Sequence, residues 1–328
     1  MTHCFAGLAL AAFVAVSGIA CRQAPDEKAL PRVRIGYRPH LTLAPVFIAK
    51  AEGLYEAEGL DVELVPIEGV ASSVPLLLQG DLDVLPGPVS AGLFNAISRG
   101  GRIRVVQEKG WYFPDDCFPT AIVRSKQLAA RDGMPRRLGT TKETFLQMFT
   151  DRTLRAHGVD PKTVELVYIP SAAEFDALIS GRLDAANLGE PWLSRALAQG
   201  VVVWEPVNRL MGRDTYSVIS YGPSLLDEAP DIGERVSRAH LKAMRLYNKG
   251  KTERNLEIVS AMLGFTPDDL RNTCWPKMRE DGLIDTTSLR KFQEWSKGRG
   301  ELDEVLPVER YWDGRFVERA TSANARTP

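Results

Sequence analysis

A stretch with glycine and small polar residues between a strand and a helix gives the first sign of a binding site. In LLLQGDLDVLPGPVSAGLFNAI, from Leu76 to Ile97, the pattern predicts a strand over Leu82–Leu85 and a helix that begins at Gly87-Pro88. Proline suits the first helical position because the N–H of that residue has no partner inside the helix. The free N–H groups of Val89 and Ser90 would then point outward, and such a helix start favours an anion.

A similar pattern returns later in the chain. GRLDA (Gly181–Ala185) echoes GDLDV (Gly80–Val84), and the residues that follow carry Asn187, Glu190 and Trp192 into the next predicted helix. Two α/β lobes, each with a strand-to-helix loop, indicate a ligand held between them.

Further side chains with suitable chemistry follow predicted strands. Thr140 is expected at a helix N-cap, with Glu143 three residues later as a capping box. The predicted ligand-binding residues are His40, Gly87, Val89, Ser90 and Trp111 from the first lobe and Thr140, Thr141, Asn187, Glu190 and Trp192 from the second. Helix-start N–H groups suit a sulfonate, phosphate or carboxylate, whereas Trp111, Tyr112 and Trp192 suit stacking on a flat ring. Glu190 would repel an anion but could accept a hydrogen bond from an aminopyrimidine or an amine. The ligand is therefore expected to be small and either anionic or heteroaromatic.

Each of these residues also has a purely structural explanation. His40 suits a solvated loop, and the tryptophans suit the core or the interface between the lobes. Thr140 and Thr141 cap a helix whether or not anything binds there, and Glu190 favours a helix N-terminus electrostatically. The sequence leaves these alternatives open.

The composition is that of an ordinary globular protein and excludes several function classes. The chain has 328 residues, 44% of them hydrophobic and 25% charged, and a net charge of −1. No basic block could neutralise phosphates, so nucleic acid is not an expected partner. The four histidines, His3, His40, His157 and His240, form no metal-ligating pattern, and no P-loop, Gly-x-Ser-x-Gly or His-Glu-x-x-His motif occurs. We therefore expect no metal, no cofactor and no enzymatic activity.

The first 21 residues have the properties of an export signal. Phe5–Ala20 is apolar, is too short for a permanent membrane span, and ends in small residues before Cys21. The segment resembles a bacterial lipoprotein signal, in which Cys21 would carry the lipid. Residues 22–31 follow as a polar linker. The protein is thus expected in the periplasm or cell envelope, held by a lipid anchor and otherwise free of the membrane.

Strands that alternate with helices position the predicted binding residues and indicate an α/β fold with mainly parallel sheets. One lobe is predicted over residues 32–120, and a second lobe with crossover strands over 121–222. The crossover strands are predicted at Phe118–Ser125 and Thr215–Gly222. Residues 223–317 show only helical patterns and are expected to return to the first lobe as a helical tail. Residues 318–328 contain few apolar side chains and are predicted to be disordered.

The segment APVFIAKAEGLYEAEGLDVELV, together with the two loop stretches described above, resembles the ABC-type substrate-binding proteins for aliphatic sulfonates, nitrate, taurine and thiamine pyrimidine precursors. This resemblance implies a type II periplasmic-binding fold, with two lobes joined by two crossover strands. It also implies a monomer that captures a small sulfonate-, nitrate- or pyrimidine-like ligand by cleft closure and delivers it to an ABC permease. A lipid or sterol carrier, a sensor and a pyrimidine-precursor synthase are the alternatives on the same fold.

Two cysteines, Cys117 and Cys274, remain after removal of the signal and would lie in an oxidising compartment. Cys117 ends the first lobe and Cys274 ends a helix expected to pack on that lobe, so a disulfide is geometrically feasible. A pair of buried free thiols agrees equally well with the sequence.

Overall fold

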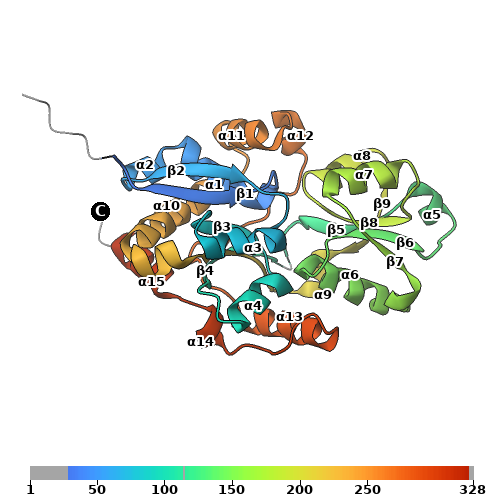
Figure 1. Cartoon of the computed structure of the whole chain (residues 1–328). Coiled ribbons are helices and arrows are strands. Elements are labelled where there is room, and N and C mark those ends of the chain that lie inside the picture. Colours follow the sequence, from blue (N-terminus) through green and yellow to red (C-terminus); the bar gives the residue numbers. More distant parts are fainter. Residues whose placement is uncertain (1–28, 114, 325–328) are drawn as a thin grey trace, which may run out of the picture. The chain divides into compact units, whose positions relative to one another are not determined.

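Residues from Pro31 onward form one compact unit built on two five-stranded sheets (Figure 1). The computed structural model describes residues 29–113 and 115–324. The predicted signal segment, Cys21 and residues 22–28 of the predicted linker lie outside the described residues. No helix within the described ranges is both long and apolar enough to cross a lipid bilayer.

The first sheet has the strand order β2-β1-β3-β10-β4. Its strands are β1 (Arg32–Tyr37), β2 (Asp61–Pro66), β3 (Val84–Pro88), β4 (Arg104–Trp111) and β10 (Thr215–Tyr221). β10 pairs antiparallel with both β3 and β4, so the other four strands share one direction. The sequence-based division placed Thr215–Gly222 in the second lobe, whereas β10 lies inside the first sheet.

The second sheet repeats this arrangement with the order β7-β6-β8-β5-β9. Its strands are β5 (Thr120–Arg124), β6 (Arg137–Thr140), β7 (Glu165–Tyr168), β8 (Ala185–Gly189) and β9 (Val202–Pro206). Here β5 is the antiparallel strand. The chain passes from the first sheet to the second between β4 and β5 and returns before β10. Each sheet therefore contains one antiparallel strand, β5 or β10, that the chain forms directly after it leaves the other lobe.

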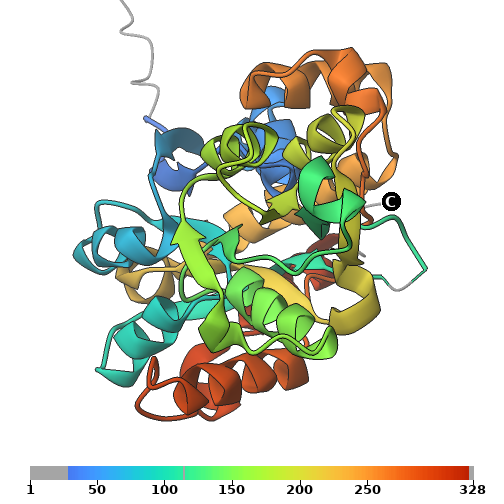
Figure 2. The ribbon, with the colours of Figure 1, turned by 90° about the vertical axis from the view of Figure 1, so that its right-hand side faces the viewer.

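Helices cover both faces of each sheet (Figure 1). In the first lobe they are α1 (Ala44–Ala51), α2 (Leu54–Ala57), α3 (Val70–Gln79) and α4 (Ala91–Ser98). In the second lobe they are α5 (Lys126–Ala130), α6 (Phe145–Ala156), α7 (Ser171–Ile179), α8 (Trp192–Ala198) and α9 (Val207–Met211). α7 and α8 lie over one face of the second sheet and α6 and α9 over the other (Figure 2).

Side chains that alternate along the strands belong to two separate hydrophobic cores. Val106 and Ile219 belong to the core under α1 and α10, whereas their neighbours Val105 and Val218 belong to the core under α3 and α4. Successive strand residues point to opposite faces, so a strand covered on both faces contributes apolar side chains to two cores. The second core continues into the other lobe through Phe145 of α6.

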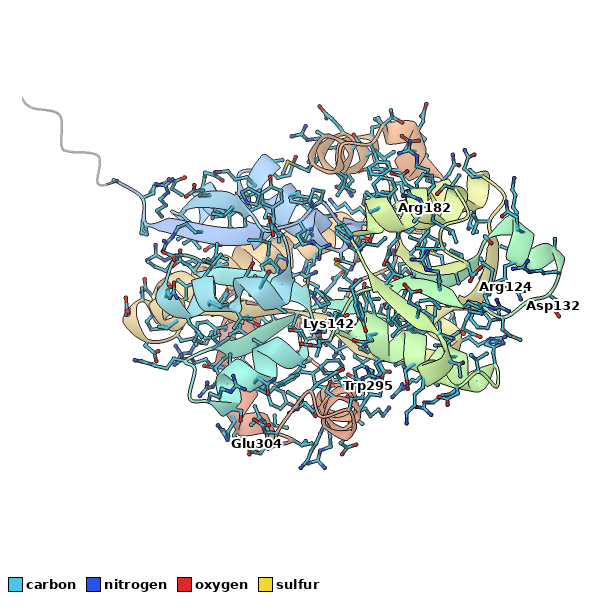
Figure 3. The ribbon with its side chains drawn as sticks, turned by 45° about the vertical axis from the view of Figure 1, so that its right-hand side comes forward. Arg124, Asp132, Lys142, Arg182, Trp295 and Glu304 are labelled. Atoms are coloured by element: carbon cyan, nitrogen blue, oxygen red, sulfur yellow. A yellow bond between two sulfur atoms is a disulfide. The ribbon has the colours of Figure 1, made fainter. Side chains whose placement is uncertain are left out.

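The helical tail contacts both lobes. It comprises α10 (Pro230–Asn248), α11 (Glu253–Leu263), α12 (Pro267–Arg271), α13 (Thr286–Gly298), α14 (Val308–Tyr311) and α15 (Arg315–Asn324). α10 packs on α1 and α15, as its buried positions at helical spacing predict. Trp295 of α13 (Figure 3) donates its indole N–H to Asp151 of α6 in the second lobe, at 3.4 Å. The surface of that lobe carries ion pairs such as Arg124–Asp132, at 3.2 Å (Figure 3).

The prediction of disorder from Glu318 is wrong for the part of the tail that the structure describes. α15 continues to Asn324, and Phe316, Val317 and Ala320 are buried. Three apolar residues at this spacing suffice because they share one helix face, which packs on α10.

The two predicted helix starts are displaced. β3 continues through Pro88, and α4 begins at Ala91 with Ser90 as N-cap, its hydroxyl accepting from Leu93 N–H at 3.4 Å. The predicted capping box at Thr140 does not form, because β6 extends to Thr140 and α6 begins only at Phe145.

The reason for both displacements is that these loops pair with other backbone. Val89 N–H donates to Tyr216 C=O at 2.9 Å. Ala91 N–H donates to Glu143 C=O at 3.0 Å, and Phe145 N–H donates to Val89 C=O at 3.1 Å. The two loops predicted to bind a ligand thus hydrogen-bond to each other across the lobes.

Cys117 and Cys274 form a disulfide. It joins the connection between β4 and β5 to the segment that follows α12. The tail is therefore tied covalently to the passage between the lobes.

Candidate ligand-binding site

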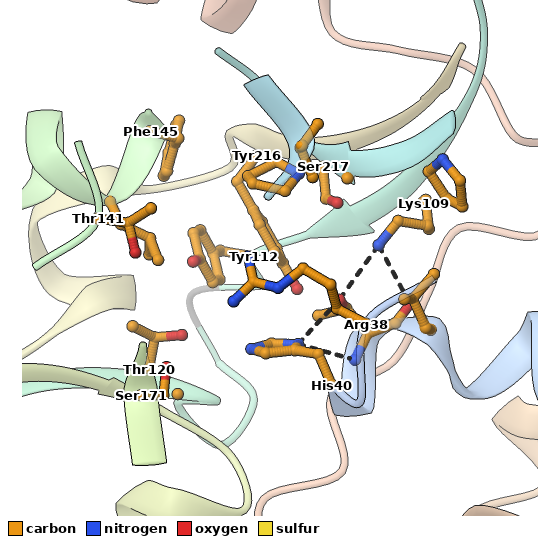
Figure 4. Close-up of a pocket in the computed structure, with 18 residues that line it drawn as sticks. Arg38, His40, Lys109, Tyr112, Thr120, Thr141, Phe145, Ser171, Tyr216 and Ser217 are labelled. Atoms are coloured by element: carbon orange, nitrogen blue, oxygen red, sulfur yellow. Dashed lines mark hydrogen bonds between the residues drawn. The ribbon is translucent and has the colours of Figure 1, made fainter. Parts of the chain in front are cut away.

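A cavity of about 70 Å³ lies between the two lobes, where several strands end. One ordered water needs roughly 10–15 Å³ on the same measure, so the cavity admits a ligand of several atoms. Its lining consists of Arg38, His40, Thr42, Leu43, Val70, Pro86, Gly87, Pro88, Lys109, Tyr112, Thr120, Thr141, Phe145, Leu146, Ser171, Gly189, Tyr216 and Ser217 (Figure 4). Both lobes contribute, as a cleft that closes on a ligand requires.

Three cationic or donor side chains reach the cavity from the first lobe. Arg38 and His40 follow the end of β1, and Lys109 lies near the end of β4. Figure 4 shows all three on one side, facing Thr120, Thr141 and Phe145 of the second lobe. Lys109 is only 1% exposed although it carries an ammonium group. A buried ammonium in a cavity wall is a specific signal, because lysine is almost never fully buried unless it is paired.

Thr42 connects two of these groups. The Lys109 ammonium donates to the Thr42 hydroxyl at 3.1 Å and to the Thr42 carbonyl at 3.3 Å. Nδ1 of His40 lies 3.0 Å from the same hydroxyl and accepts from the Thr42 backbone N–H at 3.3 Å. His40 is also the N-cap of the short 3₁₀ turn Leu41–Leu43, so the start of this turn fixes the ring.

Burial sets the charge of these groups. Burial, together with the charges of Lys109 and Arg38, lowers the pKa of His40 to about 3. The ring is therefore neutral at pH 7. Burial also lowers the pKa of Lys109 to about 7, while the neighbouring Glu108 carboxyl opposes this shift. An anion in the cavity would favour the charged ammonium.

Two buried carboxyl groups lie near the site without lining it. Burial raises the pKa of Glu108 to about 8, against the nearby charges of Arg279 and Lys109. Burial also raises the pKa of Glu174 at the start of α7, and the charge of Arg38 partly offsets this. Arg38 itself has a pKa lowered by burial, but a guanidinium keeps its charge.

The rest of the lining includes aromatic rings and hydroxyl groups. The rings of Tyr112 and Tyr216 stack with centroids 4.1 Å apart and planes 13° apart. Phe145 packs against both rings, at 5.9 and 6.1 Å. Thr141 adds a hydroxyl from the loop before α6, and Ser171 adds one from the first residue of α7. The cavity thus has a donor-rich end and an apolar, aromatic end.

This arrangement suits an anion. None of the described residues that line the cavity carries a carboxylate, whereas Arg38, Lys109 and His40 can all donate. In the described part of the chain no cluster of three or more His, Cys, Asp or Glu side chains could hold a metal ion.

The structure brings three of the ten sequence-predicted residues to the cavity wall: His40, Gly87 and Thr141. Four of the others serve the backbone or the core. Val89 pairs with Tyr216, Ser90 caps α4, and the Thr140 hydroxyl lies 3.0 Å from that of Thr150. Asn187 donates from its side chain to the carbonyl of Leu146 at 2.9 Å.

The remaining three predicted residues lie at other contacts. Glu190 accepts from the Cys274 backbone N–H at 2.9 Å and from the Ser194 hydroxyl at 2.7 Å. Trp111 lies under the guanidinium of Arg279, 4.8 Å from the ring centroid. Trp192 packs edge-on against Phe265 of the tail, with centroids 5.2 Å apart.

Sequence reasoning missed Arg38, Lys109 and Tyr216, and it named Tyr112 only as a ring suited to stacking. One signal was present: IRVVQEKGW (Ile103–Trp111) has the pattern of a strand in an α/β sheet, where strands are usually buried on both faces, and it contains a lysine. A charged residue in such a strand needs a partner, and a ligand is one such partner. For the other residues no local pattern distinguishes a cleft position from a core or surface position.

Residues 26–263 match the NMT1-like family. The chain belongs to this family. This member is 22% identical over 318 residues to YtlA of Bacillus subtilis (strain 168), whose name makes it a candidate binding protein, with 92% of this chain and 93% of YtlA covered. It is 27% identical over 191 residues to the bicarbonate-binding protein CmpA of Synechococcus elongatus, a match that covers 50% of this chain and 42% of CmpA.

Several solved structures have a fold similar to that of this protein. The periplasmic nitrate-binding protein NrtA of Synechocystis PCC 6803 gives a TM-score of 0.71 at 15% identity, over 91% of this chain and 90% of NrtA. The periplasmic aliphatic sulphonate binding protein SsuA of Escherichia coli gives 0.69 at 15% identity, over 86% of this chain and 97% of SsuA. The desulfurization enzyme DSZB gives 0.62 at 15% identity, over 90% of this chain and 99% of DSZB. The predicted two-lobed periplasmic-binding fold of this NMT1-like protein is thereby confirmed, and an enzyme shares it.

Proposed function

We propose that this NMT1-like protein is the extracytoplasmic solute-binding component of an ABC importer and that its solute is a small organic anion. The convergence of Arg38, His40 and Lys109 on one cavity between the lobes carries the proposal. CmpA, NrtA and SsuA are named as binding proteins for bicarbonate, nitrate and a sulphonate, which are all anions.

The two ends of the cavity favour an acid with a short apolar or flat body. A sulfonate or carboxylate head would meet the three donor groups, and its body would lie against Tyr112 and Phe145. Nitrate and bicarbonate have no apolar part to bury against these rings. A neutral pyrimidine would suit the rings but would leave the Lys109 ammonium buried without a counter-ion, which is costly.

Binding by closure follows from the shared lining. Arg38 and His40 belong to the first lobe and Thr141 and Ser171 to the second, so a ligand gains all its contacts only when the lobes meet. Such a ligand stabilises the closed form by its differential affinity for that form. The permease would then recognise the closed pair of lobes. A monomer suffices for this mechanism.

Two rival functions are less well supported. A pyrimidine-precursor synthase or an enzyme like DSZB needs a reactive group at the ligand. No Asp, Glu or Cys is among the described residues that line the cavity, and the Lys109 amine is engaged with Thr42. His40 is neutral and its Nδ1 is already engaged with Thr42. A lipid or sterol carrier needs far more space than about 70 Å³. A sensor would use the same cavity. Solute uptake that depends on an ABC permease would distinguish the importer component from a sensor.

The proposed location is the periplasm or cell envelope, with a lipid on Cys21 as the anchor. An acyl anchor binds a protein to the bilayer surface without a membrane-spanning helix. Replacing Cys21 by Ser is expected to move the protein from the membrane fraction to the soluble fraction. Unchanged fractionation of that variant would count against the anchor.

The test of the proposed function is a binding panel on the purified protein. Ethanesulfonate, butyrate, nitrate, bicarbonate and 4-aminopyrimidine are each added in a thermal-shift assay, followed by calorimetric titration. We expect ethanesulfonate or butyrate to raise the melting temperature, since a ligand that binds only the folded form stabilises it by mass action. Lys109→Met is expected to abolish the shift. A shift with 4-aminopyrimidine alone, or chemical conversion of any of the five compounds, would overturn the proposal.

A further inference from the structure

Thr42 has contacts that a residue serving only the fold would not need. Its hydroxyl lies 3.1 Å from the Lys109 ammonium and 3.0 Å from Nδ1 of His40. Its backbone N–H donates to the same Nδ1 at 3.3 Å, and its carbonyl accepts from Lys109 at 3.3 Å. One residue therefore engages both of the neighbouring donor groups in the cavity with all of its polar atoms.

The backbone N–H decides which nitrogen of His40 carries the proton. A neutral imidazole has one N–H and one acceptor nitrogen. Because Nδ1 accepts from Thr42 N–H, it cannot itself be protonated without placing two N–H groups against each other. The proton of the neutral ring must therefore lie on Nε2. The Thr42 hydroxyl accepts from Lys109 and can then donate its own proton to Nδ1, so both contacts agree.

Nε2 of His40 faces the second lobe. A Cβ atom built on Gly189 at the end of β8 would lie 3.1 Å from it. Gly189, like His40, lines the cavity. The N–H of the ring is thus directed to the place where the ligand and the second lobe meet.

The same residue sets the direction of Lys109. An ammonium has three N–H donors, and Thr42 accepts two of them through its hydroxyl and its carbonyl. The third N–H is left for the cavity. Lys109 is 1% exposed, so its side chain has no alternative position in water.

We infer that Thr42 is a positioning residue that holds His40 in its Nε2–H form and aims Lys109, so that both side chains present hydrogen-bond donors to the solute. This inference rests on the proposed function, because it describes the site at which the anion would bind. It defines the ligand more narrowly: the group that meets His40 and Lys109 must accept hydrogen bonds from both, as the oxygens of a deprotonated acid do. An ammonium group has no acceptor and would place a donor against a donor.

The first experiment determines directly which nitrogen of His40 carries the proton. Protein labelled with ¹⁵N-histidine is studied by NMR without ligand at pH 7, and His40→Gln identifies the His40 signals among those of the other histidines. We expect a protonated Nε2 and an unprotonated Nδ1. An Nδ1–H ring or an imidazolium would overturn the inference. This result does not depend on any ligand, so it stands apart from the test of the proposed function.

The second experiment compares Thr42→Val with Thr42→Ser. Valine keeps the size and the backbone but removes the hydroxyl, whereas serine restores it. We expect ethanesulfonate to bind Thr42→Val about tenfold or more weakly, as for a lost hydrogen bond to a charged group, and Thr42→Ser nearly as well as the native protein. The Nδ1 signal of His40 should shift in the valine variant and return in the serine variant.

The outcomes separate the two proposals. Equal binding by Thr42→Val and the native protein, or equal losses in both variants, would overturn the role of Thr42. If the native protein binds no acid of the panel, the proposed solute class fails, while the NMR result still decides the state of His40.

Discussion

Nε2 of His40 lies opposite Gly189, so close that a Cβ atom at residue 189 would be 3.1 Å away. His40 belongs to the first lobe and Gly189 ends a strand of the second, and both line the cavity. Most real Cβ contacts are longer than this distance. The absence of a side chain at Gly189 is therefore what allows the two lobes to approach at the ligand.

Gly189→Ala is expected to weaken binding of ethanesulfonate by about tenfold, since overpacking by one methyl group typically costs 1–3 kcal/mol. The added methyl would push His40 away or hold the lobes apart. The matched control is Gly298→Ala, because a Cβ at Gly298 meets nothing within 4 Å. Calorimetric titration of both variants checks this. Native-like affinity in Gly189→Ala would mean that closure does not bring His40 and residue 189 together.

Binding is expected to weaken as the pH rises from 6 to 9. The pKa of Lys109 is about 7 in the folded protein, so above pH 7 an anion must bind together with a proton. The affinity then falls by at most about tenfold per pH unit. Ionisation of Glu108, with a pKa of about 8, favours the charged ammonium and flattens the fall. His40, with a pKa of about 3, stays neutral throughout.

The control for this pH profile is Lys109→Met, which should bind weakly and without the pH dependence. Titrations of ethanesulfonate at intervals of one pH unit provide the measurement. A flat profile for the native protein would contradict the assignment of Lys109 as the titrating donor.

Removal of the disulfide is expected to destabilise the folded protein. Cys117 and Cys274 are 157 residues apart in the sequence, and the chain-entropy account gives roughly 5 kcal/mol as an upper figure for such a loop. The double variant Cys117→Ala and Cys274→Ala should therefore unfold at lower urea concentration. Mass spectrometry of an unreduced digest should show the two cysteine peptides joined. Separate, alkylated peptides from the exported protein would show that the bridge does not form.

Substitution of Trp192 distinguishes a role in packing from a contact with the ligand. Its ring packs against Phe265 of the tail and Phe175 of α7, and Arg195 lies over it with 5.5 Å to the centroid. Trp192→Ala should lower the free energy of unfolding by about 2 kcal/mol, less than for a fully buried aromatic residue. Ethanesulfonate affinity at low temperature should change little. A tenfold loss of affinity with unchanged stability would instead support the sequence-based prediction that Trp192 contacts the ligand.

Local pattern was enough for the order of the elements. Alternating strands and helices predicted two α/β lobes, and the change to purely helical periodicity after Thr215–Gly222 predicted the tail. These features follow from side-chain periodicity, which each segment carries in its own sequence. Helix starts were harder to predict. Ser90 is the N-cap of α4, later than the predicted start at Gly87-Pro88, whereas Thr140 caps no helix. In both places the backbone pairs with other strands and loops, and that pairing is not a local property.

The sequence by itself determined the two-lobed α/β class, the family and three residues of the cavity wall: His40, Gly87 and Thr141. Only the tertiary structure decided that Arg38 and Lys109 join them and that Ser90 and Asn187 serve the scaffold. The reason is geometric: the strand pattern tells which residues share a face, but not whether that face meets a helix or another lobe. Lys109 is buried against Thr42 because β4 ends at the cavity beside the turn that holds Thr42, and no stretch of sequence near residue 109 specifies that neighbour.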